Sequence, residues 1–429
     1  MQNKFSKNLT SMLFSRVLVV FLGIVSMVII SRVLGPSGQG EYSLAMLIAN
    51  VLFIVFNVGL PSSLIFFVGK YGLNKIGFSV LVLYLLASLA GVILYAFVIV
   101  FYSEVYFAGL INDLLLLCGL IFLAKMAASY YQSVFLAEEK IFNFNLAVVI
   151  QHLTFFLFVV ILFMNREYFS VVNILIVFLL SIILSIIYSI KTSEKFHMEP
   201  VLRADIKPIL KYGLNSHFNN IVAFLIYRTD LVVINYYLGV EAVGLYAIGI
   251  LIVENILLVA TIAGTTLLTR LVNSESIDFK LISYVCKLVI FTTLCAVLVL
   301  YFSSEFLVVL VFGEKFVGSV SPLQILLFGT VFSAQSKILA NYFAASNQLK
   351  VNSYVALVLF FMNIIFNLWL VPLYGLIGAA MATVIVQLIN FVIKNFIFAR
   401  KSSLSLFENI FITREFVSYV RLFICRFLN

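Results

Sequence analysis

The sequence predicts an all-α integral membrane protein with about twelve transmembrane helices in two six-helix bundles that are related as parallel repeats. Three observations lead to this fold class. Of the 429 residues, 64% are hydrophobic and only 10% are charged, whereas soluble domains carry about 25% charged residues. Long apolar runs follow one another along the chain. A short turn sequence also occurs twice, roughly half the chain apart, as expected for a duplicated transporter.

The apolar runs are expected to be helices, because lipid offers the backbone no hydrogen-bonding partners and the runs are too long for barrel strands. A span needs about 20 residues, which sets the expected count of about twelve. The expected spans, in chain order, are 10–33, 42–68, 78–102, 109–135, 143–164, 168–190, 208–237, 242–272, 281–302, 321–344, 351–372 and 376–398. The first run is interpreted as a retained span, because it is too long for a leader peptide and no small-residue cleavage site follows.

The basic residues set the expected orientation of these spans. The loops on one side carry most of the lysines and arginines, whereas those on the other side carry only Arg32, Arg166 and Lys315. Cytoplasmic loops are the ones enriched in Lys and Arg. Both termini are therefore predicted to be cytoplasmic.

The longest polar connection, 191–207, divides the spans into two sets of six. We predict an N-terminal six-helix bundle at 1–190, a cytoplasmic linker at 191–207 and a C-terminal six-helix bundle at 208–400. The tail, 401–429, mixes apolar residues with arginines and is interpreted as a basic amphipathic segment on the inner membrane surface. A weakly ordered tail is the alternative.

The repeated turn follows the first and the seventh spans. Residues 34–45 read LGPSGQGEYSLA, and residues 238–249 read LGVEAVGLYAIG. Leu, two Gly and Tyr recur at matching places, at an offset of 204 residues. Both copies face the same side of the membrane, so the halves are expected to be parallel repeats about an axis along the membrane normal.

Composition and motifs exclude several classes of protein. The net charge of +9 comes from lysines and arginines in short loops, which set topology rather than form a nucleic-acid surface. The chain has no Walker motif, no GxGxxG in a strand–helix setting, no HExxH and no CxxC. We expect no cofactor, no metal site and no enzyme, so any work must come from ion gradients or from the substrate's own gradient.

Ionisable residues inside spans are costly, and their usual explanation is a functional site facing the protein interior. The span 208–237 is the richest case. On a regular helix His217, Asn220 and Arg228 share one face, and Asp230 lies nearly opposite. We expect Arg228 to face a central cavity and Asp230 a neighbouring helix. The alternative is that Arg228 pairs with an acid on another span and locks helices together.

Two further pairs of residues follow the duplication. The repeat offset maps Asn50 onto Glu254 and Asn57 onto a threonine, which suggests equivalent polar stripes around one shared cavity. Interhelical hydrogen bonds, worth about 0.6 kcal/mol on average in membranes, are the alternative for the asparagines. Lys125 and Lys337 lie in the fourth and tenth spans, which are counterparts. They indicate that the central cavity has a symmetric basic lining. The alternative is that either lysine extends its ammonium group to a membrane interface.

Four features together resemble a known family. They are the sequence SRVLGPSGQGEY at 31–42, the sequence YRTD at 227–230 followed by the second turn, and the hairpin with Asn363, Asn367 and PLYGLIGAA at 372–380. The fourth is the twelve-span layout itself. The chain resembles polysaccharide flippases of the O-antigen (Wzx) type, within the multidrug/oligosaccharidyl-lipid/polysaccharide exporter superfamily.

The resemblance implies movement of undecaprenyl-diphosphate-linked oligosaccharide repeat units from the inner to the outer leaflet of the bacterial inner membrane, by alternating access. It further implies membrane lipid as surroundings, H⁺ or Na⁺ as coupling ion, and a polysaccharide polymerase and chain-length regulator as partners, with no nucleic acid. The implied substrate-binding residues are Arg228, Lys337, Lys125, Arg32, His217, Asn220, Asn50 and Asn57. Glu254 and Asp230 are the implied ion-coupling residues, and Arg228 is the main anion contact.

Other functions stay open at this point. A lipid II flippase or a multidrug antiporter of the same superfamily would share the layout. The first would need more cations in the first two spans, and the second would need acidic residues in the first half. An O-antigen polymerase-type enzyme is less favoured, because such enzymes need a long outer loop with catalytic groups and the outer loops here are short.

Overall fold

The computed structural model describes residues 2–106, 111–193, 206–226, 228–272, 274, 277–402 and 404–411. Within these residues the chain forms α-helices and two short 3₁₀ helices, and no strand. Contacts divide the chain into two compact units. The first comprises Met1–Phe224 with Leu238–Gly244, and the second comprises Leu225–Tyr237 with Leu245–Asn429.

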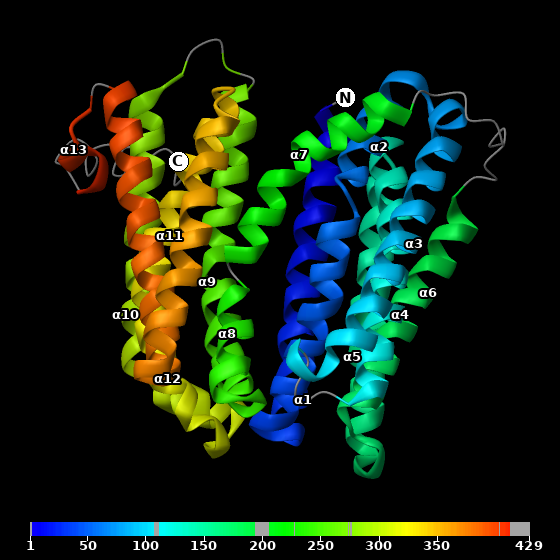
Figure 1. Ribbon diagram of the computed structural model, residues 1–429. Helices are drawn as coiled ribbons and strands as arrows, with labels where there is room; N and C mark the ends of the chain where they lie inside the picture. Colours follow the sequence, from blue (N-terminus) through cyan, green and yellow to red (C-terminus); the bar gives the residue numbers. More distant parts are fainter. Residues whose placement is uncertain are drawn as a thin grey trace. The chain divides into compact units, whose positions relative to one another are not determined.

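The first unit is a bundle of helices around a buried central one (Figure 1). Its elements are α1 (Gln2–Phe56), α2 (Leu60–Tyr71), α3 (Leu73–Tyr106), α4 (Asn112–Ala137), α5 (Ile141–Met164), the 3₁₀ helix η1 (Arg166–Tyr168), α6 (Val171–Thr192) and most of α7 (Ile206–Ile226). Helix α4 contacts α1, α2, α3, α5 and α6. Its Cys118, Ile121 and Phe122 are fully buried, so the apolar core of this unit lies along α4.

The second unit has α11 at its centre. Its elements are α8 (Thr229–Leu238), α9 (Val240–Val272), α10 (Phe279–Phe312), the 3₁₀ helix η2 (Glu314–Ser319), α11 (Val320–Ala345), α12 (Leu349–Ser402) and α13 (Leu406–Ile410). Helix α11 packs against both α10 and α12. Its fully buried Leu327, Ala334 and Ile338 form part of this core.

Helix α1 contains two of the predicted spans, because the chain reverses at Gly35. Gly35 has a φ of 70°, in the left-handed region that glycine tolerates. Beyond it, the Gln39 Nε2 donates to the Met27 Sδ at 3.4 Å, although twelve residues of straight helix would span about 18 Å. The second copy of the turn also has a glycine with positive φ, Gly239 at 83°.

Helix α12 reverses in the same way. Gly375 has a φ of 61°, and a β-carbon on Gly378 would overlap the carbonyl oxygen of Leu370, eight residues earlier. Among the described residues, ten helices are long and apolar enough to cross a membrane. Since α1 and α12 each hold two predicted spans, these ten helices account for the twelve spans expected from the sequence.

The two copies of the repeated turn meet inside the first unit. A β-carbon on Gly40 would overlap the carbonyl oxygen of Val240, and one on Gly244 would overlap that of Pro36. Backbones can approach this closely only where a side chain is absent. This contact explains why glycine recurs at positions 40 and 244 of the two copies.

Two predicted spans are not continuous helices, and the sequence-based expectation is wrong at these points. The span 42–68 is interrupted between α1 and α2, where Val58 and Gly59 have φ angles of 50° and 69°. The span 208–237 is interrupted between α7, which ends at Ile226, and α8, which begins at Thr229. Helical phase therefore cannot be carried across either break.

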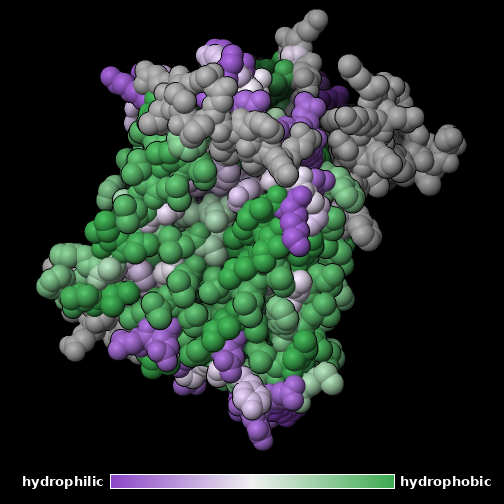
Figure 2. Space-filling model, turned by 90° about the vertical axis from the view of Figure 1, so that its right-hand side faces the viewer, coloured by the Kyte–Doolittle hydropathy of each residue, from purple (hydrophilic) through white to green (hydrophobic). Residues whose placement is uncertain are grey.

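The surface of the first unit suits a lipid environment. On the face shown in Figure 2, hydrophobic residues cover the middle and hydrophilic residues gather toward the two ends. Exposed apolar side chains lie along α3 and α6, among them Leu85, Leu89, Phe97, Leu180 and Ile187. An apolar surface of this extent is typical of a protein whose sides face acyl chains.

The contact-based division differs in position from the one drawn on the sequence. It assigns 208–224 to the first unit, whereas the sequence was divided at the linker 191–207. Most of that linker, 194–205, and the tail 412–429 lie outside the described residues. The two six-span halves therefore stay a prediction.

Candidate functional site

In the first unit, Lys125 of α4 has neutral partners. Its ammonium group donates a hydrogen bond to the Asn50 Oδ1 of α1, and it lies 5.8 Å from the centre of the Phe53 ring. Asn50 and Phe53 are three residues apart, so they share one face of α1. Within the described residues no carboxylate forms an ion pair with Lys125.

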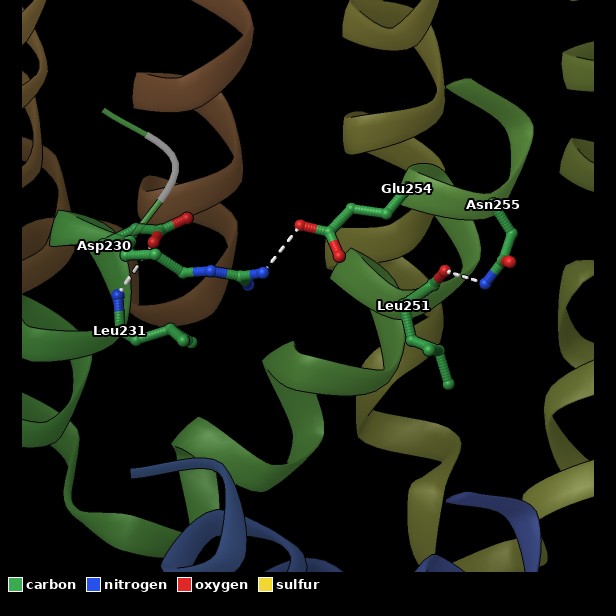
Figure 3. Close-up of polar contacts among 6 residues, drawn as sticks. Asp230, Leu231, Leu251, Glu254 and Asn255 are labelled. Atoms are coloured by element: carbon green, nitrogen blue, oxygen red, sulfur yellow. Dashed lines mark hydrogen bonds and ion pairs between the residues drawn. The ribbon is translucent and has the colours of Figure 1, made fainter. Parts of the chain in front are cut away.

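In the second unit, a carboxylate pairs with one cation and interacts with a second. The Arg228 Nη2 lies 2.8 Å from the Glu254 Oε1 of α9 (Figure 3). The Lys337 Nζ of α11 donates to the Thr261 Oγ1 at 3.2 Å, and Glu254 also interacts electrostatically with this lysine. The side chains of Arg228 and Glu254 are 28% and 47% exposed, so the ion pair is only partly buried.

The break before α8 determines where Arg228 and Asp230 point. The backbone N–H of Arg228 donates to the Leu225 carbonyl at 3.1 Å, which ends α7. Asp230 lies in the first turn of α8, where the helix dipole favours a negative charge. Its Oδ1 accepts the Leu231 N–H at 2.9 Å (Figure 3), and the residue is only 3% exposed.

Asp230 belongs to a buried polar chain that the sequence reasoning missed. The Tyr246 side chain of α9 interacts electrostatically with its carboxylate. The Tyr246 hydroxyl is 3.4 Å from the Thr383 Oγ1 of α12. Tyr246 is the tyrosine of the second repeated turn, and it is fully buried. The recurrence of tyrosine in both copies was the signal available in the sequence.

Several predicted site residues are engaged in contacts within the first unit or are exposed. The His217 Nε2 is hydrogen bonded to the Ile54 carbonyl, and the Asn57 Oδ1 accepts the Gly59 N–H at 2.9 Å, next to the break before α2. Asn220 and Arg32 are exposed. The structure thus gathers Arg228, Glu254 and Lys337 in one unit and Lys125 with Asn50 in the other. It leaves His217, Asn57, Asn220 and Arg32 apart from these contacts, and it buries Asp230 against α9.

The two units repeat one design with different charges. In each, the lysine of the fourth span of the half reaches the polar stripe of the second span, as Lys125 does with Asn50 and Lys337 with Thr261. At the position equivalent to Asn50, the second unit carries Glu254. At this position the polar stripe of the second unit therefore carries a carboxylate that interacts with cations, whereas the stripe of the first unit carries a neutral amide.

Comparison with known proteins shows the family to which the chain belongs. A family model described as polysaccharide biosynthesis protein matches residues 5–268, which is more than half of the chain. The chain belongs to the polysaccharide biosynthesis protein family. The resemblance inferred from the turn and hairpin motifs is therefore confirmed at the level of the family.

The chain is similar to a polysaccharide biosynthesis protein and to a membrane protein. The capsular polysaccharide biosynthesis protein CapF of Staphylococcus aureus is 32% identical over 118 residues, which is 27% of this chain and 30% of CapF. The uncharacterized membrane protein MJ1375 of Methanocaldococcus jannaschii is 25% identical over 386 residues, covering 86% of this chain and 91% of MJ1375. The match to CapF thus spans less than a third of that protein's length.

Solved structures share the fold over nearly the whole chain. The lipid II flippase MurJ, in an inward closed conformation, has a TM-score of 0.75 at 19% identity and covers 97% of this chain and 95% of its own. An inward-facing multidrug resistance MATE family transporter of the MOP superfamily has a TM-score of 0.67 at 14% identity and covers 90% and 96%. The predicted fold class is confirmed. The proteins with this fold are a flippase and transporters rather than enzymes, in agreement with the prediction.

Proposed function

We propose that the protein is a flippase that moves undecaprenyl-diphosphate-linked oligosaccharide repeat units from the inner to the outer leaflet of the bacterial inner membrane. The units would serve surface polysaccharide synthesis, and both chain termini would be cytoplasmic. Membership of the polysaccharide biosynthesis protein family, the partial relation to CapF and a fold like that of MurJ support this function. A polysaccharide polymerase and a chain-length regulator would act on the delivered units.

The observation that carries the proposal is the state of Lys125. A diphosphate needs cationic partners to enter the membrane interior, where unpaired charges are costly. Within the described residues, Lys125 contacts the Asn50 amide and the Phe53 ring and interacts electrostatically with His152. No carboxylate there pairs with it, so its charge is available to a phosphate. The sequence alone favoured Arg228 as the main anion contact, but Arg228 already pairs with Glu254. We therefore rank Lys125 first, with Arg228 and Lys337 assisting.

Glu254 gives this arrangement a means of ion coupling. A diphosphate that binds Arg228 and Lys337 competes with Glu254 for the same two cations. Once displaced, the carboxylate loses its counter-charges and would be free to bind the coupling ion, H⁺ or Na⁺. Substrate binding and ion binding would then be linked at one residue. Asp230, buried against Tyr246, is the second candidate and could hold H⁺ or Na⁺.

The test compares cells that lack the gene with cells in which the wild type, Lys125→Gln or Arg228→Gln is restored at equal protein level. We expect deletion to leave lipid-linked units on the inner leaflet and to remove surface polysaccharide. Lys125→Gln should fail to restore it, whereas the control Lys191→Gln, at an exposed lysine, should restore it fully. Single units displayed on the outside after deletion would favour a polymerase instead.

A lipid II flippase is the second candidate, because the structure of MurJ matches 97% of the chain with a TM-score of 0.75. In that case, deletion would halt peptidoglycan synthesis and cause lipid II to accumulate, with surface polysaccharide precursors unaffected at first. Measuring both classes of lipid-linked precursor in the same deletion strain separates the two candidates.

A further inference from the structure

Four aromatic rings gather where α2 ends and α7 begins, both within the first unit. The rings of Phe66 and Tyr212 are stacked, with centroids 4.5 Å apart and an interplanar angle of 17°. Phe67 stacks on Tyr71 at 6.1 Å and meets Tyr212 edge-on at 5.9 Å. We call Phe66, Phe67, Tyr71 and Tyr212 the aromatic platform.

The backbone holds this platform in place. A β-carbon on Gly213 would lie 2.6 Å from the carbonyl oxygen of Val58, so α7 rests directly on the break between α1 and α2. One turn earlier in α7, the Ile209 carbonyl accepts a hydrogen bond from the Ser63 Oγ at 2.8 Å. Tyr212 lies between these two contacts and is thereby fixed against Phe66. A surface preformed in this way loses little conformational freedom on binding a ligand.

The aromatic platform is exposed, and the two segments that form it carry only positive charges. Phe66, Tyr71 and Tyr212 are 45%, 46% and 38% exposed. The Lys70 Nζ lies 5.0 Å from the centre of the Tyr71 ring, and Lys211, next to Tyr212, is exposed. Residues 60–76 and 206–218 contain four lysines and no carboxylate. This stretch of surface therefore attracts anions.

The order of side chains along α2 matches the order of groups in a phospholipid. Ile65 and Phe66 are exposed at the end of the apolar run 42–68, and Lys70 and Tyr71 follow within about one turn. The lysines of α7 stand at the start of the apolar run 208–237, at the same predicted membrane surface. Acyl chains would meet the apolar side chains, and a headgroup phosphate would meet the ammonium groups.

We propose that the aromatic platform, with Lys70 and Lys211, binds an anionic phospholipid through its headgroup phosphate at the membrane surface predicted to be cytoplasmic. Aromatic rings favour the headgroup level of a bilayer, and basic residues close to the membrane attract anionic lipids. The site does not include Lys125, Arg228, Glu254 or Lys337, so it does not depend on the proposed transport function. The diphosphate of a lipid-linked sugar carries similar charge, and the experiment distinguishes the two lipids.

The experiment uses the purified full-length protein and native mass spectrometry. The probes are phosphatidylglycerol, phosphatidylcholine with the same acyl chains, and undecaprenyl phosphate. K70Q/K211Q is expected to weaken phosphatidylglycerol binding by roughly 25-fold, at about fivefold per lysine. The matched control K191Q/K350Q removes two exposed lysines outside the site and should match the wild type. F66L/Y212L, which keeps both lysines, should weaken phosphatidylglycerol binding by a smaller factor.

Three outcomes would overturn the proposal. Unchanged phosphatidylglycerol binding in K70Q/K211Q would show that these lysines do not bind the lipid. An equal loss in the control would mean a general effect of surface charge. A loss confined to undecaprenyl phosphate would assign the platform to the lipid-linked substrate instead. Retained size-exclusion profile and unchanged phosphatidylcholine binding would show that the variants are folded.

Discussion

Lys125 shows that the partners of a charged side chain determine whether it is available to bind a ligand. A lysine with a carboxylate partner is neutralised, whereas Lys125 has Asn50 and Phe53. Its replacement leaves no carboxylate unpaired, so the fold should tolerate the change. For this reason Lys125 allows a substitution that separates binding from stability.

We predict that Lys125→Met weakens binding of undecaprenyl diphosphate by about 10- to 100-fold, the worth of a hydrogen bond to a charged group. Isothermal titration of the purified protein measures the effect, with Lys125→Arg as the control that keeps the charge. The melting temperature should stay close to that of the wild type. Loss of folding in both variants would show that Lys125 has a packing role.

Glu254 should behave in the opposite direction. Removing its charge in Glu254→Gln frees Arg228 and Lys337 from a competitor, and a partly exposed ion pair of this kind is worth about 1 kcal/mol. We therefore predict about fivefold tighter binding of undecaprenyl diphosphate. Transport driven by a pH gradient in proteoliposomes should be lost. Weaker binding by Glu254→Gln would contradict the competition between carboxylate and diphosphate.

At the scale of elements, the contact of α7 with the break between α1 and α2 sets how the first unit is built. A β-carbon on Gly213 would lie 2.6 Å from the Val58 carbonyl oxygen and 2.8 Å from the Ser63 Oγ. We predict that Gly213→Ala destabilises the protein by about 1–3 kcal/mol, the usual cost of overpacking, as measured by its thermal unfolding in detergent.

Gly69 provides the matched control for this prediction. It lies in α2, and a β-carbon there would meet nothing within 4 Å. Alanine is favoured over glycine inside a helix by up to about 1 kcal/mol, so Gly69→Ala should be neutral or stabilising. Equal melting temperatures for Gly213→Ala and Gly69→Ala would show that α7 does not rest on this break.

Helix α13 gives a prediction about pH outside the spans. Hydrogen bonds from the backbone and side chain of Ser405, at 2.9 Å and 3.0 Å, hold the pKa of Glu408 below its ordinary value of 4.5. A lowered pKa stabilises the folded form above pH 4.5, and this contribution is lost as the pH falls. Hydrogen-exchange protection of α13 should therefore drop below about pH 4.5. Ser405→Ala removes the side-chain hydrogen bond but keeps the backbone N–H donor, so it should reduce that pH dependence only in part.

At the scale of the whole molecule, the twelve spans were predictable because span length and apolar composition are local properties. The break at 57–59 was not, since it depends on contacts such as that between Gly59 and Gly213. Helical phase placed Asn50 on a polar face, but its pairing with Lys125, 75 residues away, needs the packed bundle. Lys394, in the expected span 376–398, is buried in α12, and its hydrogen bond to the Ser336 carbonyl of α11 likewise needs the packed bundle.

The repeated turns give a prediction at this scale. Gly40 and Gly244 lie against backbone of the other copy, so Gly40→Ala and Gly244→Ala should each destabilise the protein. Because the two sites share one contact, the double variant should cost less than the sum of the single variants. Gly23→Ala, where a β-carbon would meet nothing within 4 Å, is the control within the same helix. Full additivity, measured by thermal unfolding, would contradict the shared contact.

The division of the chain into units also has a consequence for biosynthesis. The first unit includes Leu238–Gly244, which the ribosome makes only after Leu225–Tyr237 of the second unit. Part of the second unit is therefore synthesised before the first unit has all of its residues. A gene split within the linker would leave 206–224 and 238–244 on the second fragment, so neither fragment would carry a whole unit.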